Sequence, residues 1–289
     1  MPETFLGWVV YLLQQYGSVL LKGAVVTLLL TVVGTFIGCI IGLIVGVIQT
    51  IPLEDNDSKV KRTLVRCLQR LLDAYVEVFR GTPMIVQAMV VYYGAMSLFD
   101  IDMSPLFAGF LVVSINTGAY MAETVRGGIE SVDPGQKEAA IAIGMDHIQT
   151  MRCVILPQAL RNVMPQLGNN LIINIKDTYV LNVISVTELY FASKSAAGVY
   201  YKYFEIFFIT CVIYFIMTFT ALTGSVSHFA IGDKPEVLPL VLCIAFTLIF
   251  ARIAAKIANK ASAKTLNRAT GVILLILGVV VLGFSFLSK

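Results

Sequence analysis

Amide and carboxylate side chains recur at helical spacing within an otherwise apolar stretch near residues 168–190. Counted from the first, they lie at positions 0, 4, 8, 11 and 22, which at about 100° per residue places all of them within about 80° of one another. These residues are Gln166, Asn170, Asn174, Asp177 and Glu188. The apolar stretch near 105–125 repeats the pattern on a smaller scale with Asn116, Tyr120 and Glu123.

Such groups can bind a polar solute through hydrogen bonds and charge. A carboxylate at the centre of a bilayer costs roughly 2.5–3.5 kcal/mol, so both polar faces are expected to line water or each other. The pattern therefore predicts a hydrophilic path between the two stretches. The alternative is internal ion pairing, because Asp177 adjoins Lys176 and Arg126 follows Glu123 by three positions.

The segment Arg80-Gly81-Thr82-Pro83 lies early in another apolar stretch, near 71–98. Proline removes a backbone hydrogen bond and frees a carbonyl, while glycine permits an unusual turn. One interpretation is a break whose freed backbone meets a ligand or a partner subunit, as in the discontinuous helices of transporters. The other is that Pro83 starts the embedded helix and Arg80 anchors its end at the interface.

The elements that position these residues are membrane spans. Of 289 residues, 57% are hydrophobic and 13% are charged, against about 25% charged in a typical soluble domain. We therefore expect an all-α, multi-pass membrane protein. Apolar runs of about 20 residues or more, enough to cross a bilayer, occur near 23–50, 71–98, 105–125, 168–190 and 205–229, with two more near 236–251 and 270–287.

Composition also excludes several functions. The net charge of +3 is small and divided among loops, which argues against a nucleic-acid partner. The five cysteines lie far apart and there are only two histidines, so neither a metal site nor a disulfide framework is predicted, and we assign no catalytic residue. Residues 1–22 lack the basic start of a signal peptide and are expected to form a short helix in the membrane interface.

The distribution of Lys and Arg orients the first five spans. The loops at 52–70 and 126–163 hold nine of these residues: Lys59, Lys61, Arg62, Arg66, Arg70, Arg126, Lys137, Arg152 and Arg161. The loops on the opposite side hold three: Lys22, Lys194 and Lys202. The positive-inside rule then predicts that both long loops are cytoplasmic and that the N-terminus is outside.

The first span carries a glycine at every fourth position: Gly34, Gly38, Gly42 and Gly46. Such a ridge lets another helix approach to backbone contact. It is interpreted either as a static packing seam or as a surface on which helices slide within a moving bundle. Neither alternative specifies a function.

The polar loop Glu138–Pro157 is predicted to hold two short helices. Asp133 and Pro134 are good helix-start residues, Gly144 interrupts the first helix, and Asp146 opens a second that runs to a stop at Leu156-Pro157. Short side chains at Ala139 and Ala140 would let another protein approach closely, and Glu138 offers a charge to pair. We expect an amphipathic knob that docks on a partner.

At these residues the chain resembles a known family. Glu138-Ala139-Ala140, Gly144, Val154 and Leu156-Pro157 are spaced as in the EAA signature of the membrane subunits of bacterial ABC importers, with valine where the pattern usually has isoleucine. The polar amino acid branch of that family is similar at residues 80–87, 120–123, 126–129, 157–159 and 169–178. The resemblance covers residues 1 to about 230.

The resemblance implies a five-span transmembrane core, residues 23–230, with a cytoplasmic coupling loop at 127–165 that sits in a cleft of a separate ATPase subunit. The implied coupling residues are Glu138, Ala139, Ala140, Gly144, Leu156 and Pro157. Together with the polar faces, it gives these substrate-path candidates: Arg80, Thr82, Pro83, Glu123, Asn170, Asn174, Asp177 and Glu188. The chain has no G-x-x-x-x-G-K-[ST] loop, so ATP and Mg²⁺ are expected on the partner.

The function that the resemblance implies is that of the permease subunit of an ATP-driven importer for polar amino acids in a bacterial cell membrane. Its implied partners are the ATPase, a second permease subunit and an external solute-binding protein. One alternative is an ion-coupled secondary carrier that uses Glu123, Asp177 and Glu188 to relay ions. Another is a non-transporting scaffold or receptor subunit.

Residues 231–289 do not fit the resemblance. Between the last two apolar runs, basic residues recur at every fourth position: Arg252, Lys256, Lys260, Lys264 and Arg268. A simple hairpin would carry these charges outside, against the positive-inside rule. The segment is weakly similar to the end of sulfite-exporter-type permeases. It is a hairpin with inverted charge, a basic helix along the inner membrane surface, or a fusion or frameshift artefact.

Overall fold

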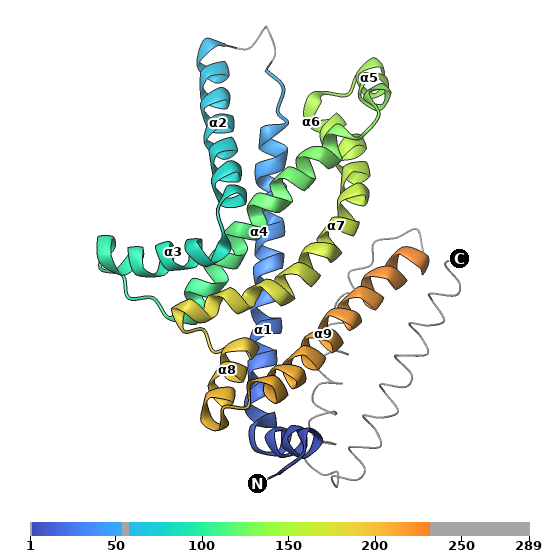
Figure 1. Cartoon of the computed structure of the whole chain (residues 1–289). Coiled ribbons are helices and arrows are strands. Elements are labelled where there is room, and N and C mark those ends of the chain that lie inside the picture. The colour runs from blue at the N-terminus through green and yellow to red at the C-terminus, as the bar shows by residue number, and fades with distance from the viewer. Residues whose placement is uncertain (1, 54–57, 232–289) are drawn as a thin grey trace.

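The computed structural model describes residues 2–53 and 58–231, with side chains up to residue 222. Helices make up almost all of this part of the chain (Figure 1). The α-helices are α1 (Phe5–Gln49), α2 (Lys59–Gly81), α3 (Met84–Phe99), α4 (Pro105–Glu130), α5 (Pro134–Ala142), α6 (His147–Thr150), α7 (Leu156–Asp177), α8 (Leu189–Tyr200) and α9 (Tyr203–Ile231). A π-helical turn η1 (Met151–Ile155) precedes α7, and a 3-10 helix η2 (Thr178–Ile184) follows it. The expected all-α fold is confirmed, whereas residues 232–289 lie outside the described part.

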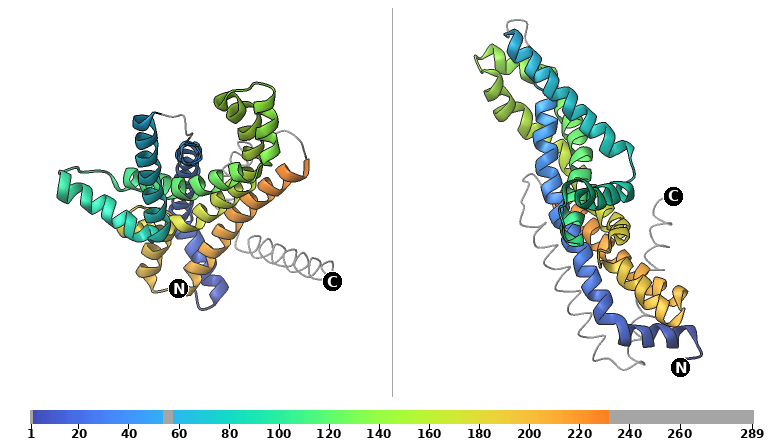
Figure 2. Two further views of the ribbon diagram at one scale, coloured as in Figure 1. Left: turned by 90° about the horizontal axis from the view of Figure 1, so that it is seen from above. Right: turned by 90° about the vertical axis from the view of Figure 1, so that its left-hand side faces the viewer.

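Three described helices are long and apolar enough to cross a membrane: α1, α4 and the Tyr203–Leu222 part of α9. The pair α2 and α3 adds a fourth candidate if its bent halves count as one span. The predicted runs at 23–50, 105–125 and 205–229 thus correspond to real helices. Residues 1–22, for which a short interfacial helix was predicted, join α1 without interruption from Phe5, and the first turns of α1 run at an angle to the rest (Figure 2).

The glycine ridge of α1 packs along α4. A Cβ added at each ridge glycine would come closer than 3.0 Å to an atom of α4, and the partners advance in step with the glycines: Gly34 with Val113, Gly38 with Thr117, Gly42 with Met121 and Gly46 with Val125. The two helices therefore run parallel at near backbone contact. This close fit favours the packing-seam interpretation of the ridge.

The stretch at 71–98, which was predicted as one apolar span, is not one straight helix. It divides at Gly81–Pro83 into α2 and α3, which meet at a bend of 112°. The amide of Gln87 bonds two of the carbonyls near the break, donating to the oxygens of Phe79 and Thr82 at 2.9 Å each. The chain is thus broken here and Pro83 precedes the first turn of α3, but the carbonyls of Phe79 and Thr82 are bonded within the subunit and not left for a ligand or a partner.

The stretch at 168–190 is not a single helix either. The α-helix ends at Asp177 and tightens into η2, which is rich in β-branched residues that disfavour an α-helix. Ser185 then adopts a left-handed conformation with φ 64°, and Glu188 caps α8. The prediction that residues 166–188 share one helical face is therefore wrong for Glu188.

The two ends of the molecule differ in what they carry. The N-terminal end of α2 and the short helices α5 and α6 lie at one end, while the N-terminus and α8 lie at the other (Figures 1 and 2). The two loops richest in Lys and Arg are therefore on the same side of the bundle. Buried apolar clusters fill the interior, one joining α1 to α8 and α9 and another joining α4 to α7.

Candidate functional site: the coupling loop and the charged cluster at the helix break

The coupling loop begins as its local sequence predicts. Asp133 caps α5 by accepting a hydrogen bond from the Gly135 N–H at 2.8 Å, and Pro134 occupies the first turn. Glu138 and Ala139 are exposed on this helix. Ala140 is only 4% exposed, so the prediction that it forms part of the open docking surface is wrong. In a helix this short, one face must turn toward the protein that supports it.

The predicted interruption at Gly144 and the second short helix of the coupling loop are also formed. Gly144 has φ +87°, a conformation that strains any residue with a Cβ. Asp146 and Gln149 make a capping box, in which the Asp146 carboxylate accepts from the Gln149 N–H at 2.8 Å. Both helix-boundary predictions are confirmed.

The predicted helix stop at Leu156-Pro157 is wrong. The chain passes from α6 through η1 directly into α7, and Pro157 lies in the first turn of α7. Proline has no N–H to donate, and the wider π-helical turn accommodates the residues before it. The Gln158 side chain donates to the Val154 carbonyl at 2.9 Å. The coupling loop is thus joined to α7 by continuous helical backbone.

Large apolar side chains cover the outer surface of the coupling loop. Ile141 is 54% exposed, Ile143 78% and Ile148 74%, beside the exposed Glu138. Isoleucines grouped on a projecting element favour contact with another protein. We call these four residues the coupling surface.

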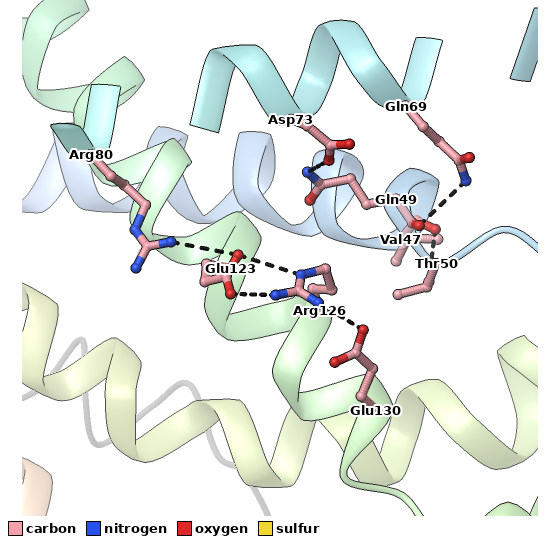
Figure 3. A network of polar contacts seen from close by, with 9 residues as sticks. All are labelled: Val47, Gln49, Thr50, Gln69, Asp73, Arg80, Glu123, Arg126 and Glu130. Carbon is pink, nitrogen blue, oxygen red and sulfur yellow. Dashed lines mark hydrogen bonds and ion pairs between the residues drawn. The ribbon is translucent and has the colours of Figure 1, made fainter. Parts of the chain in front are cut away.

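A charged cluster lies where α2 ends beside α4 (Figure 3). Glu123 of α4 pairs with Arg80 of α2 at 3.5 Å and with Arg126 one turn along its own helix. Arg126 continues to Glu130 at 2.8 Å. The Arg80 guanidinium also lies 5.7 Å from the centre of the Tyr120 ring, within cation–π range.

The side-chain amides of Gln87 and Asn116 form a hydrogen-bonded pair beside this cluster. Asn116 was part of a predicted polar face, whereas Gln87 was not selected from the sequence. Gln87 accepts from the Asn116 side chain at 3.0 Å, and Asn116 also donates to the Phe79 carbonyl. These bonds join the α2–α3 break to α4. An amide four residues after a helix-breaking proline, inside an apolar run, is the signal that could have identified Gln87.

The polar face of α7 is divided between core and surface. Asn174 donates to the hydroxyls of Thr35 and Thr117 at 2.8 and 2.9 Å, and Asn170 donates to the sulfur of Met121. Both asparagines are buried against α1 and α4, whereas Gln166 and Asp177 are exposed. Of the three substrate-path candidates on this helix, Asn170, Asn174 and Asp177, only Asp177 is exposed within the subunit.

Glu188 is fully buried at the other end of the molecule from the coupling surface. Its carboxylate accepts from the backbone N–H groups of Tyr190 and Phe191 at 2.8 and 2.7 Å and from the Tyr214 hydroxyl at 3.2 Å. Thr27 of α1 approaches it at 3.5 Å. These bonds link α1, α8 and α9 and give Glu188 the geometry of a helix cap.

Comparison with known proteins agrees with this arrangement. A family model described as binding-protein-dependent transport system inner membrane component matches residues 62–268, a range that extends past residue 230. The arginine transport system permease protein ArtQ of Bacillus subtilis (strain 168) is 35% identical over 147 residues, which cover 51% of this chain and 67% of ArtQ. The glutamine transport system permease protein GlnP of Escherichia coli (strain K12) is 41% identical over 145 residues, which cover 50% of this chain and 66% of GlnP. The chain thus spans about two thirds of the length of these relatives.

Two solved structures share the fold. A crystal structure of an amino acid ABC transporter with histidines has a TM-score of 0.66 and 36% identity, covering 78% of this chain and 97% of that one. An inward-facing form of the MetNI methionine ABC transporter has a TM-score of 0.60 and 22% identity, covering 72% of this chain and 93% of that one. The second likeness shows the fold alone. Neither these proteins nor the geometry favours the ion-coupled carrier.

Proposed function

We propose that this chain, which belongs to the family of binding-protein-dependent transport system inner membrane components, is the membrane subunit of an ATP-driven amino acid importer. The observation that carries the proposal is the coupling surface. It presents a carboxylate and three exposed isoleucines on an α5–α6 knob that continues through η1 into α7. A knob with this connection can transmit force from a partner into the membrane helices.

The energy would come from a separate ATPase, because the chain has no phosphate loop. That partner would hold ATP and Mg²⁺ and receive the coupling surface, with Glu138 pairing to a basic group. Its closure would move α5 and α6 and, through the continuous backbone, α7. Rigid-body rocking of the helices would then open the path to the outside.

The orientation follows from charge. The nine basic residues of the two long loops support a cytoplasmic position for the coupling surface, with the N-terminus and α8 outside. A second permease subunit would complete the path, and an external solute-binding protein would deliver the amino acid at the α8 end. The description of the family as an inner membrane component supports the inner membrane as the location of the subunit.

The path would run beside the α2–α3 break. Arg80, Thr82 and Glu123 are exposed or half-buried there, and Asp177 is exposed at the end of α7. Asn170, Asn174 and Glu188, by contrast, are bonded inside the subunit. We therefore assign solute contact to the first group and support of the helices to the second.

The function is tested by purifying the chain in a mild detergent and reconstituting the purified complex into lipid vesicles. We expect an ATPase subunit to copurify, and vesicles with ATP and a solute-binding protein to accumulate labelled L-glutamine or L-arginine. Uptake driven by an ion gradient in the absence of ATP would contradict the proposal.

A further inference from the structure

Arg80 has unused binding capacity at the α2–α3 break. A guanidinium carries five N–H donors, yet among the described residues Arg80 makes one ion pair, at 3.5 Å, and no hydrogen bond. Its side chain is 41% exposed. The break lies about midway between the two ends of the molecule (Figure 1), where an ionisable group is costly unless it serves a ligand or a partner.

The backbone that carries Arg80 is held in place. The Thr82 hydroxyl donates to the Val78 carbonyl at 2.8 Å, and Gln87 ties the carbonyls of Phe79 and Thr82 together. Within the described part of the chain, the side chain itself is held only by Glu123 and by the face of Tyr120. The guanidinium can therefore turn toward a ligand without any change in the helices.

Glu123 does not depend on Arg80 for its position. Arg126 contacts both of its carboxylate oxygens, one of them at 3.4 Å from Nε, and is itself anchored by Glu130 at 2.8 Å. When Arg80 turns away, Glu123 stays in place with one side open. The site then offers a cation and an anion a few ångströms apart.

From this geometry we propose that Arg80 and Glu123 bind the charged head of an amino acid. Arg80 takes the α-carboxylate through two parallel N–H···O bonds, and Glu123 accepts from the α-ammonium group. The proposal rests on the proposed function and specifies how the path recognises its solute.

The proposed binding mode also predicts a preference for solutes that carry both an α-carboxylate and an α-ammonium group. A zwitterion that enters the Arg80–Glu123 pair gives each side chain a new partner of opposite charge, so no charge is left unpaired. An amine or a carboxylic acid replaces only one partner, and the other charge stays uncompensated. The site would thus accept different side chains but require both head groups.

Equilibrium binding to the complex of this chain with its ATPase, purified without the solute-binding protein, tests the site. Labelled L-glutamine and L-arginine are the probes. The competitors are agmatine and 4-aminobutanamide, which lack the carboxylate, and glutaramic acid, which lacks the ammonium group. We expect Arg80→Gln and Glu123→Gln each to weaken binding roughly 10- to 100-fold, and the competitors to displace neither probe. Asp73→Asn, which removes an exposed charge from the same helix as Arg80, should leave binding unchanged.

The thermal unfolding temperature of each variant separates binding from folding, and Arg80→Lys and Glu123→Asp, which keep the charges, replace any variant that unfolds. Normal binding by Arg80→Gln or Glu123→Gln, displacement by agmatine, or no binding by the wild-type complex would overturn the proposal. If wild-type vesicles show ATP-dependent uptake in such a case, Arg80 and Glu123 are a structural ion pair and the transport function stands. Absence of ATP-dependent uptake by the wild type would instead contradict the function itself.

Discussion

Gly42 of α1 packs on Met121 of α4 so closely that the gap between the helices has no room for a methyl group. Because the backbone N–H of Ala122 would also lie within 2.8 Å of an added Cβ, side-chain movement alone cannot relieve the overlap. The α1–α4 seam is therefore the rigid part of the bundle, against which α2 and α7 are placed.

Gly42→Ala should destabilise the subunit by about 1–3 kcal/mol, because it overpacks this seam. Gly17→Ala is the matched control: it lies in the same helix, and apart from the adjoining backbone of α1 no atom of the described chain lies within 4 Å of an added Cβ. Thermal unfolding in detergent should show a lower transition temperature for Gly42→Ala alone. Equal transition temperatures for the two variants would contradict the seam.

Asn174→Ala should lower stability by about 1–3 kcal/mol, because it leaves the buried hydroxyls of Thr35 and Thr117 without their donor. Gln166→Ala, on the exposed part of the same helix, should change stability little. In vesicles, the solute concentration for half-maximal uptake should stay unchanged for Asn174→Ala. A large rise in that concentration without loss of stability would place Asn174 in the path.

Glu188→Ala should cost about 2 kcal/mol or more, since it removes the cap of α8 and leaves two N–H groups unpaired. Glu188→Gln keeps an acceptor oxygen and should be milder. Tyr214→Phe removes one bond and should cost about 1 kcal/mol. Thermal unfolding should show the largest loss of stability for Glu188→Ala. A smaller loss for Glu188→Ala than for Glu188→Gln and Tyr214→Phe would contradict the capping role.

Trp8 is the only tryptophan of the sequence, so its fluorescence reports on the end of the molecule where α1 meets α8. Its ring is 8% exposed, lies 5.8 Å from the Tyr200 ring and has the Lys202 ammonium 5.0 Å from its centre. Tyr200→Ala should expose the indole and shift its emission to longer wavelength. Tyr203→Ala, an exposed neighbour, is the control, and a shift there of the same size would argue against the packing of Trp8 on Tyr200.

Features set by a few adjacent residues could be predicted from the sequence. Asp133 and Asp146 cap helices through their own side chains, and Gly144 supplies a backbone conformation that other residues avoid. The spans α1 and α4 follow from composition alone. These predictions need no knowledge of distant parts of the chain.

Features that depend on helix continuity could not be predicted. The Gly81-Thr82-Pro83 sequence allowed a break as one of two interpretations, but an average of apolar content over 71–98 does not register the 112° bend that forms there. The placement of Glu188 assumed 100° per residue beyond Asp177, where the helix had already tightened into η2. Whether Ala140 faces its own chain or a partner depends on how α5 docks, and the sequence of a nine-residue helix does not contain that information.

Charge reversal at Glu138 is the sharpest test of force transmission from an ATPase through the coupling surface. In vesicles containing the reconstituted complex, ATP hydrolysis and amino acid uptake are measured together for Glu138→Arg and for Gln136→Arg. Both substitutions place arginine at an exposed position of α5. We expect Glu138→Arg to lower uptake per ATP hydrolysed at least about tenfold, since the proposed ion pair with the ATPase would become a repulsion, and Gln136→Arg to keep the wild-type ratio. An unchanged ratio of uptake to ATP hydrolysis for Glu138→Arg would contradict force transmission through the coupling surface.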